Sequence, residues 1–516
     1  MHTFYEEGKK FFDSKNYEEA WNIYTQGDRD GNVYCSYGMA QCLMYGYGVE
    51  EDNVSATEIY RRIFPTLENL AKQGDALAQG QLGCMYSVGN GVEQSDEQAL
   101  YWYEQAAEQG YLDAQVSLSS MYLNGEGVEQ SDEQAVYWTT KAAEQGDALA
   151  QYRLASMYYD EECVEQSYEN AAYWYEQAAK QGNVDAQSFL AYMYSEGEGV
   201  EQDEEQAAYW YGQAAKQGDA FSQSRLAGRY QYGDGIEQNY EQALYWYTQA
   251  ADQGDEDAQH DLIEMAFDLA FKLFNEQNYE QAIYWFTIAA EQGDVVAQHN
   301  LGLIYENGNG VEQNYEQAVY WYTEAVMSGY VDSLYNLAGM YYDGRGVEQS
   351  YEQAFDGYTE AANEGHLSAQ FNLARMYYEG TGVEQSYEEA AYWFEEVAMQ
   401  GDVISQFNLG TMYYNGNGVE QSYEQAVYWY TKAAEQGYLD AQFNLGVIYE
   451  KGKEMPQNLE QARHWYTKAA EQGHLTAKLN LSIMSLGDTI DKIVGQDDTH
   501  LGHTIARIIS QDDDLN

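Results

Sequence analysis

The chain has 516 residues, more than a single hydrophobic core can hold, since such cores stop growing near ~250–300 residues. Its formal net charge is −62, from 24 basic and 86 acidic residues, so we expect no binding to nucleic acid or to anionic membranes. No stretch approaches the ~20 apolar residues of a membrane span, and no signal peptide is evident, which predicts a cytoplasmic protein without membrane insertion.

The first glycine-bounded segment, from Gly31 to Gly74, is longer than those that follow it. It spans 43 residues and includes Pro65, so we expect a long or kinked second helix there. From Gly74 onward a glycine, usually in the string QG, recurs every 36 residues with one step of 39. The members of this series are Gly74, Gly110, Gly146, Gly182, Gly218, Gly254, Gly293, Gly329, Gly365, Gly401, Gly437 and Gly473. Such a period indicates a stack of repeats.

Each repeat reads as two helices. In the unit from Tyr438 to Gly473, the first helix has small and apolar residues at a helical spacing, and so does the second, which contains Trp465. Loops of the form GxGVEQ join them, and a Ser followed by Gln three residues later, as at Ser131 and Gln134, predicts a capping box at the second helix.

One loop departs from this pattern. Glu161 and Cys163 stand where the other loops have glycine. A non-glycine residue with positive φ costs about 1 kcal/mol, so we expect this loop to adopt another shape.

Tryptophan occupies one site of the repeat throughout the chain, with Gly357 as the exception, where we expect a weak point. The residues are Trp102, Trp138, Trp174, Trp210, Trp246, Trp285, Trp321, Trp393, Trp429 and Trp465. A single hairpin cannot bury such a ring, whereas stacked neighbours can, and burial stabilises by at most about 4–6 kcal/mol per ring.

The repeat resembles the Sel1-like family, a relative of the tetratricopeptide repeat, on the residues Ala441-Gln442, Leu445-Gly446, Tyr449, Gly452, Ala462, Trp465-Tyr466, Ala469-Ala470 and Gly473. The resemblance implies an all-α fold, a right-handed superhelical solenoid of antiparallel helix hairpins whose first helices line a concave face. It also implies a scaffold or adaptor that binds other proteins.

The unit with the 39-residue step lacks the glycine loop and is similar to the N-terminus. KLFNEQNYE, from Lys272, aligns with KFFDSKNYE, from Lys10, and both resemble an ordinary tetratricopeptide hairpin. We interpret each as the start of an array, which gives residues 1–262 and 263–484; a tolerated change in loop length is the alternative. A lone helix from Leu475 to Met484 is expected to cap the stack, and residues 485–516 to form capping helices and an acidic tail.

The best candidate site is a series of asparagines with an aromatic residue before most of them. The partner-binding residues of this hypothesis are Asn300, Asn336, Asn372, Asn408, Asn444, Tyr335, Phe371, Phe407 and Phe443, and His299 stands at the first aromatic position. The tetratricopeptide resemblance implies that these residues lie near the concave groove, where amides bond a peptide backbone. Alternatively, each asparagine bonds the next helix and sets repeat stacking.

The sequence contains few signs of a catalytic site. Nucleotide-binding, zinc-protease, nucleophile-elbow and calcium-loop motifs are all missing, so we expect no enzyme, no metal and no cofactor. The leading hypothesis is a non-catalytic scaffold for a protein or peptide, and the charge leaves a basic partner, a solubility role or a high-salt habitat open. The first alternative is an acidic decoy that binds basic proteins or mimics nucleic acid. A β-lactamase-like hydrolase is the second, although this chain lacks the paired cysteines of the family members linked to β-lactams.

Overall fold

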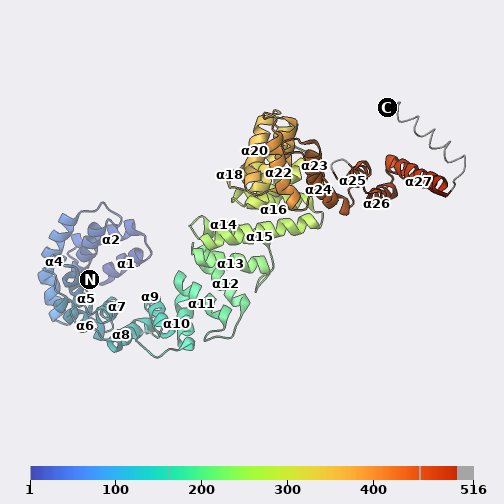
Figure 1. Ribbon diagram of the computed structural model, residues 1–516. Helices are drawn as coiled ribbons and strands as arrows, with labels where there is room; N and C mark the ends of the chain where they lie inside the picture. The colour runs from blue at the N-terminus through green and yellow to red at the C-terminus, as the bar shows by residue number, and fades with distance from the viewer. Residues whose placement is uncertain (1, 162, 453–454, 497–516) are drawn as a thin grey trace. The chain divides into compact units, whose positions relative to one another are not determined.

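The protein is an all-α stack of hairpins in the computed structural model, which describes residues 2–161, 163–452 and 455–496. These described residues contain helices and turns but no strand. The chain divides into two units, Met1–Leu262 and Ile263–Asn516, and each unit is a series of helix pairs (Figure 1). The boundary falls inside one continuous helix, α15, from Glu256 to Asn275.

Unit 1 begins with a hairpin and continues as a regular series that leads into α15. Its helices are α1 (His2–Asp13), α2 (Tyr17–Arg29), α3 (Val33–Tyr45), α4 (Asn53–Lys72), α5 (Ala76–Val88), α6 (Asp96–Glu108), α7 (Leu112–Asn124), α8 (Asp132–Glu144), α9 (Ala148–Tyr159), α10 (Tyr168–Lys180), α11 (Val184–Glu196), α12 (Glu204–Lys216), α13 (Ala220–Tyr232) and α14 (Tyr240–Ala251).

Unit 2 repeats the same plan from the end of α15. Its helices are α16 (Tyr279–Glu291), α17 (Val295–Asn307), α18 (Tyr315–Met327), α19 (Val331–Asp343), α20 (Tyr351–Asn363), α21 (Leu367–Glu379), α22 (Tyr387–Met399), α23 (Val403–Asn415), α24 (Tyr423–Glu435), α25 (Leu439–Lys451), α26 (Leu459–Glu471) and α27 (Leu475–Gln496). The last helix does not end at Met484, as expected, but continues to Gln496. Residues 497–516 lie outside the described residues.

The helix ends are closed by short polar contacts. Ser131 is an N-cap whose hydroxyl accepts from the Gln134 N–H, as the sequence predicts. The predicted capping box is wrong in its second half, because the Ser131 N–H donates to the Tyr122 carbonyl of the preceding helix at 2.9 Å. Ser350, Ser386 and Ser422 make the equivalent bond. The start of each second helix is therefore attached to its own first helix.

Tryptophans and small residues form the core between hairpins, as predicted. Trp138 is buried in a cluster with Tyr103 of the preceding hairpin and with Leu118 and Met121 of its own hairpin. At Gly357, a Cβ atom would lie 3.0 Å from the Ala338 Cβ and 3.7 Å from the Leu334 Cδ1. Leu334 therefore fills space beside Gly357, the one residue that replaces the tryptophan.

Buried glutamines connect successive segments in a way that the sequence analysis did not anticipate. Gln79 is 4% exposed; its amide donates to the Ala71 carbonyl at 3.0 Å, and its oxygen accepts from Gln109 at 2.7 Å. The same pairing joins Gln115 with Gln145, Gln151 with Gln181, Gln187 with Gln217, Gln223 with Gln253, Gln406 with Gln436, and Gln442 with Gln472. These pairs explain why AQ and QG recur, since a buried amide must be hydrogen-bonded.

Two of the irregular segments keep the expected geometry and one does not. Helix α4 is longer than its neighbours and contains Pro65, as expected. The turns before α2 and α16 match each other, with positive φ at Lys15 and at Gln277. The expected change of shape at Glu161 and Cys163 is wrong, because both residues retain positive φ, 58° and 68°. Both residues therefore adopt the left-handed conformation that glycine adopts in the other loops.

Candidate functional site

The first helices of the hairpins define the inner face of each unit. They come close to one another, α1 to α3, α5 to α7 and α17 to α19, whereas no pair of second helices approaches as closely among the described residues. A stack whose first helices are crowded together is curved toward them. The inner, concave face therefore carries the side chains of the first helices.

One position on these helices corresponds to the predicted asparagine series, and we call it the ladder position. In unit 2 it is occupied by Asn300, Asn336, Asn372, Asn408, Asn444 and Asn480, all of them half-buried. In unit 1 it is occupied by Gln81, Ser117, Arg153, Phe189 and Arg225. Three of the unit 1 residues, Gln81, Ser117 and Arg225, line cavities formed by neighbouring first helices.

Three of the ladder asparagines, Asn336, Asn444 and Asn480, are bonded to a tyrosine of the preceding hairpin. The Tyr322 hydroxyl donates to the Glu306 carboxylate at 2.7 Å and also pairs with the Asn336 amide. Burial and the Glu306 carboxylate raise the pKa of Tyr322, so the hydroxyl keeps its proton. Asn444 pairs with Tyr430 in the same way. These contacts have the form expected of residues that set repeat stacking.

The other three ladder asparagines have no such contact. Asn300, Asn372 and Asn408 make no side-chain hydrogen bond within the described part of the chain. The second-helix residue equivalent to Tyr322 is Phe286 before Asn300 and Phe394 before Asn408, and phenylalanine has no hydroxyl to offer. Asn372 follows Tyr358 and still makes no such bond among the described residues.

Tyr335, Phe407 and Phe443 pack between hairpins, whereas Phe371 packs within its own hairpin. Tyr335 stacks on His366 with ring centroids 4.5 Å apart, and Phe443 stacks on His474 at 4.3 Å. Phe407 lies 4.9 Å from the Tyr438 ring, and Phe371 lies 5.8 Å from the Phe394 ring. These contacts join neighbouring helices along the inner face. Only part of the surface of each ring is exposed.

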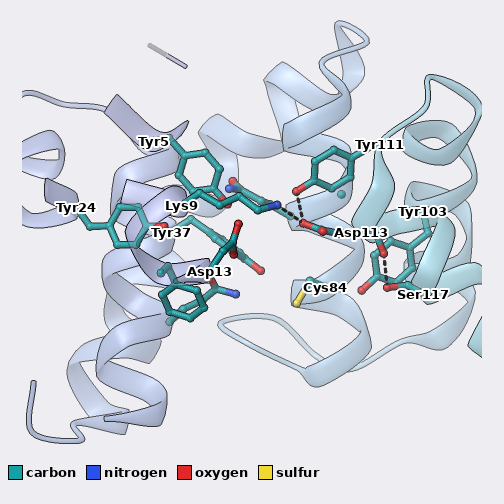
Figure 2. A pocket seen from close by; sticks show the side chains of 14 residues that line it. Tyr5, Lys9, Asp13, Tyr24, Tyr37, Cys84, Tyr103, Tyr111, Asp113 and Ser117 are labelled. Carbon is teal, nitrogen blue, oxygen red and sulfur yellow. Dashed lines mark hydrogen bonds and ion pairs between the residues drawn. The ribbon is translucent and has the colours of Figure 1, made fainter. Parts of the chain in front are cut away.

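A cavity of about 300 Å³ lies on the inner face at the start of unit 1, and no sequence motif predicts it. In Figure 2, Tyr5, Tyr24 and Tyr37 line one side, and Tyr103, Tyr111 and Ser117 line the other. Lys9 of α1 reaches across to Asp113 of α7, with 2.8 Å between Nζ and Oδ2, and Tyr111 donates to the same carboxylate at 2.9 Å. Gln81 and Ser117 give the only sequence signal, as exceptions to the asparagine pattern.

A second cavity, of about 380 Å³, lies further along unit 1 and has a different charge pattern. Arg225 and Arg229 line it together with acidic residues. Arg229 is fully engaged, with Glu204 at 2.5 Å and the Ser195 hydroxyl at 2.9 Å. Burial raises the pKa of the adjacent Tyr211 to about 12, although both arginines oppose the shift.

The spacing and hairpin geometry above coincide with a known repeat. The family model of the Sel1 repeat matches residues 33–63, 76–111, 112–147, 148–183, 184–219, 220–255, 276–294, 295–330, 331–366, 367–402, 403–438 and 439–474. The chain belongs to the Sel1 repeat family. Residues 1–32 and 256–275 lie outside the matched Sel1 segments, and they include the first helices of the two hairpins that resemble tetratricopeptide repeats.

Solved structures include other Sel1 proteins. The crystal structure of c5321, a protective antigen of uropathogenic Escherichia coli strains with an SLR fold, is 31% identical and covers 95% of this chain and 94% of that chain, with a TM-score of 0.38. A Sel1 repeat protein from Oxalobacter formigenes is 27% identical over 71% of this chain and 93% of that chain, with a TM-score of 0.33. Yeast Tom70 is 14% identical over 95% and 98%, with a TM-score of 0.27. No curated protein matches the chain.

The match to the Sel1 family also concerns the expectations about protein binding and catalysis. Its fold is a repeat scaffold of the kind that commonly mediates protein interactions, and proteins of the family are generally non-catalytic. No helix among the described residues is both long enough and apolar enough to cross a membrane.

Proposed function

We propose that this Sel1 protein is a non-catalytic scaffold that binds a protein or peptide along its concave face. The observation that carries the proposal is the difference among the ladder asparagines. Asn300, Asn372 and Asn408 are half-buried on the inner face and have no side-chain partner among the residues that the structure describes, while Asn336 and Asn444 in the same array are bonded to tyrosines. A carboxamide that both donates and accepts suits the backbone of an extended chain.

Phe371 and Phe407 support the same role. Each ring precedes one of the asparagines that have no side-chain partner among the described residues and is half-buried, so an apolar surface lies beside an amide. Apolar surface with a few well-placed polar groups is the usual composition of a recognition site. The net charge of −62 favours a partner with a basic surface, since opposite charges steer association.

The test compares two pairs of asparagines in the full chain. A displayed library of random dodecapeptides is selected on the wild-type protein, and the selected peptides are measured against Asn372→Ala/Asn408→Ala and against Asn336→Ala/Asn444→Ala. We expect the first double variant to lose peptide affinity at unchanged melting temperature. The second should lower the melting temperature, because it leaves two buried tyrosine hydroxyls with one partner fewer.

Two results would contradict the proposal. One is a library that yields no peptide, and the other is a set of peptides that bind the Asn372→Ala/Asn408→Ala variant as tightly as the wild type. Affinities measured over a salt series separate the acidic-decoy alternative, whose binding must collapse as salt rises because it depends on charge alone. Binding that persists at high salt would support recognition by the groove.

A further inference from the structure

The cavity at the start of unit 1 contains a buried amide whose hydrogen-bonding capacity is not met. Gln81 is 2% exposed, and neither its nitrogen nor its oxygen makes a well-formed hydrogen bond among the described residues. The Tyr5 hydroxyl lies beside it and can satisfy one of the two atoms at most. Burying an unsatisfied polar atom costs about 1–3 kcal/mol, so a bound group that both donates and accepts would recover that energy.

The walls of this cavity are tyrosine rings. Tyr5, Tyr37 and Tyr103 are each nine-tenths buried or more, and Figure 2 shows the rings of Tyr5 and Tyr37 across the cavity from those of Tyr103 and Tyr111. Burial raises the pKa of each of these tyrosines, so the hydroxyls stay neutral. The faces of neutral tyrosine rings attract cations and stack on planar groups.

The charges at the cavity leave one carboxylate without a cation. Asp113 is paired with Lys9 and Tyr111, whereas Asp13 makes no hydrogen bond and no ion pair within the described residues. Burial raises the pKa of Asp13, as do Asp113 and Glu6, while Lys9 opposes them. Two carboxylates and one ammonium line the cavity, so its net charge is −1.

We propose that this cavity binds the side chain of an arginine residue of the partner protein. A guanidinium is planar, which suits the tyrosine walls, and its N–H groups donate to the Asp13 carboxylate and to the Gln81 oxygen. The main-chain carbonyl of the arginine residue accepts from the Gln81 nitrogen. A lysine side chain offers a compact ammonium that does not stack, and the ammonium already present, that of Lys9, is held by Asp113.

The inference rests on the proposed function, because it names what one stretch of the concave face recognises. Its test uses the full-length protein and three short capped peptides, Gly-Arg-Gly, Gly-Lys-Gly and Gly-citrulline-Gly, with binding followed by saturation-transfer NMR. Citrulline keeps the shape of arginine but has no charge. We expect saturable binding of the arginine peptide, with the lysine and citrulline peptides weaker by roughly tenfold.

Two variants locate the binding. Gln81→Met keeps the length of the side chain without its amide, and Asp13→Asn removes the unpaired charge; each should weaken the arginine peptide by roughly tenfold. Glu133→Gln, on the exposed start of α8, removes one charge away from the cavity and should change nothing. Circular dichroism confirms that each variant is folded.

The inference is overturned if the arginine peptide shows no saturable binding, if citrulline binds equally well, or if both cavity variants bind like the wild type. Its failure is distinguishable from failure of the scaffold proposal. Library peptides that bind unit 2 and lose affinity in the Asn372→Ala/Asn408→Ala variant would support the scaffold even if the arginine peptide does not bind.

Discussion

The two units are built from the same hairpin, yet their inner faces differ at the ladder position. Unit 2 repeats asparagine there, whereas unit 1 has four residue types in five hairpins, with arginine at both Arg153 and Arg225. The tryptophan, alanine and glutamine positions that hold the stack together are shared by both units. The residues that stabilise the stack therefore differ from the residues that form its inner surface, so the inner surface varies without loss of the fold.

Within unit 2 the ladder asparagines differ from one another in their hydrogen bonding. The same residue type is bonded at Asn336 and Asn444 and unbonded at Asn300, Asn372 and Asn408. At two of the unbonded sites the cause is a phenylalanine in the neighbouring helix. A phenylalanine in the second helix thus leaves Asn300 and Asn408 without a partner among the described residues, whereas Asn372 lacks one although Tyr358 precedes it.

The largest expected effect tests whether the two units are separate folding blocks. Trp138→Ala and Trp429→Ala each remove a ring that is less than 10% exposed and packed on the preceding hairpin, so each should cost about 3–5 kcal/mol. In urea unfolding, we expect the two variants to lower the midpoints of different transitions. If both variants shift one shared transition equally, the division into two arrays is wrong.

A smaller effect is expected at the irregular loop of unit 1. Glu161 retains a φ of 58°, so Glu161→Gly should raise the free energy of unfolding by about 1 kcal/mol. The matched control is Gly125→Ala in the preceding loop, where φ is 73° and a loss of similar size is expected. Thermal and urea melts of the two variants measure both changes, and a destabilised Glu161→Gly protein would show that the side chain has another role.

The hydroxyl of Tyr430 tests the bonded state of the ladder. It pairs with Thr411 at 3.0 Å and with Asn444, so Tyr430→Phe should cost about 1 kcal/mol. The reverse change, Phe394→Tyr, should give Asn408 a partner and weaken peptide binding without a loss of stability. Melting temperature and peptide affinity are measured for both variants. Unchanged peptide affinity in Phe394→Tyr would show that Asn408 is not part of the binding site.

The smallest effect concerns pH and the first aromatic position of unit 2. Burial lowers the pKa of His299, while Asp332 and Glu306 oppose the shift. The folded pKa lies below the unfolded value of about 6.5, so the stability contributed by His299 is present above that pH and is lost as the pH falls toward the folded pKa. His299→Phe copies Phe371 at the equivalent site, and its unfolding free energy should fall less than that of the wild type between about pH 7.5 and about pH 5.5. Parallel pH profiles would contradict this.

The sequence by itself determined the repeat, its helices, their serine caps and the buried tryptophans, because each depends on residues within one hairpin or the next. Which ladder asparagines are bonded became clear only from the packed helices, since the partner of each bonded asparagine stands in another helix. The tertiary structure also decided that Leu334 fills space beside Gly357 and that the loop at Glu161 keeps its positive φ.

The cavity of unit 1 depends most on tertiary structure. Lys9 and Asp113 are 104 residues apart, and they meet because small rotations between successive hairpins add up to a curve that brings α1 onto α7. No local pattern encodes the size of those rotations, which follow from how side chains pack between neighbours. The sequence therefore specified the repeating hairpin, and the packing between successive hairpins specified where the inner face forms a cavity.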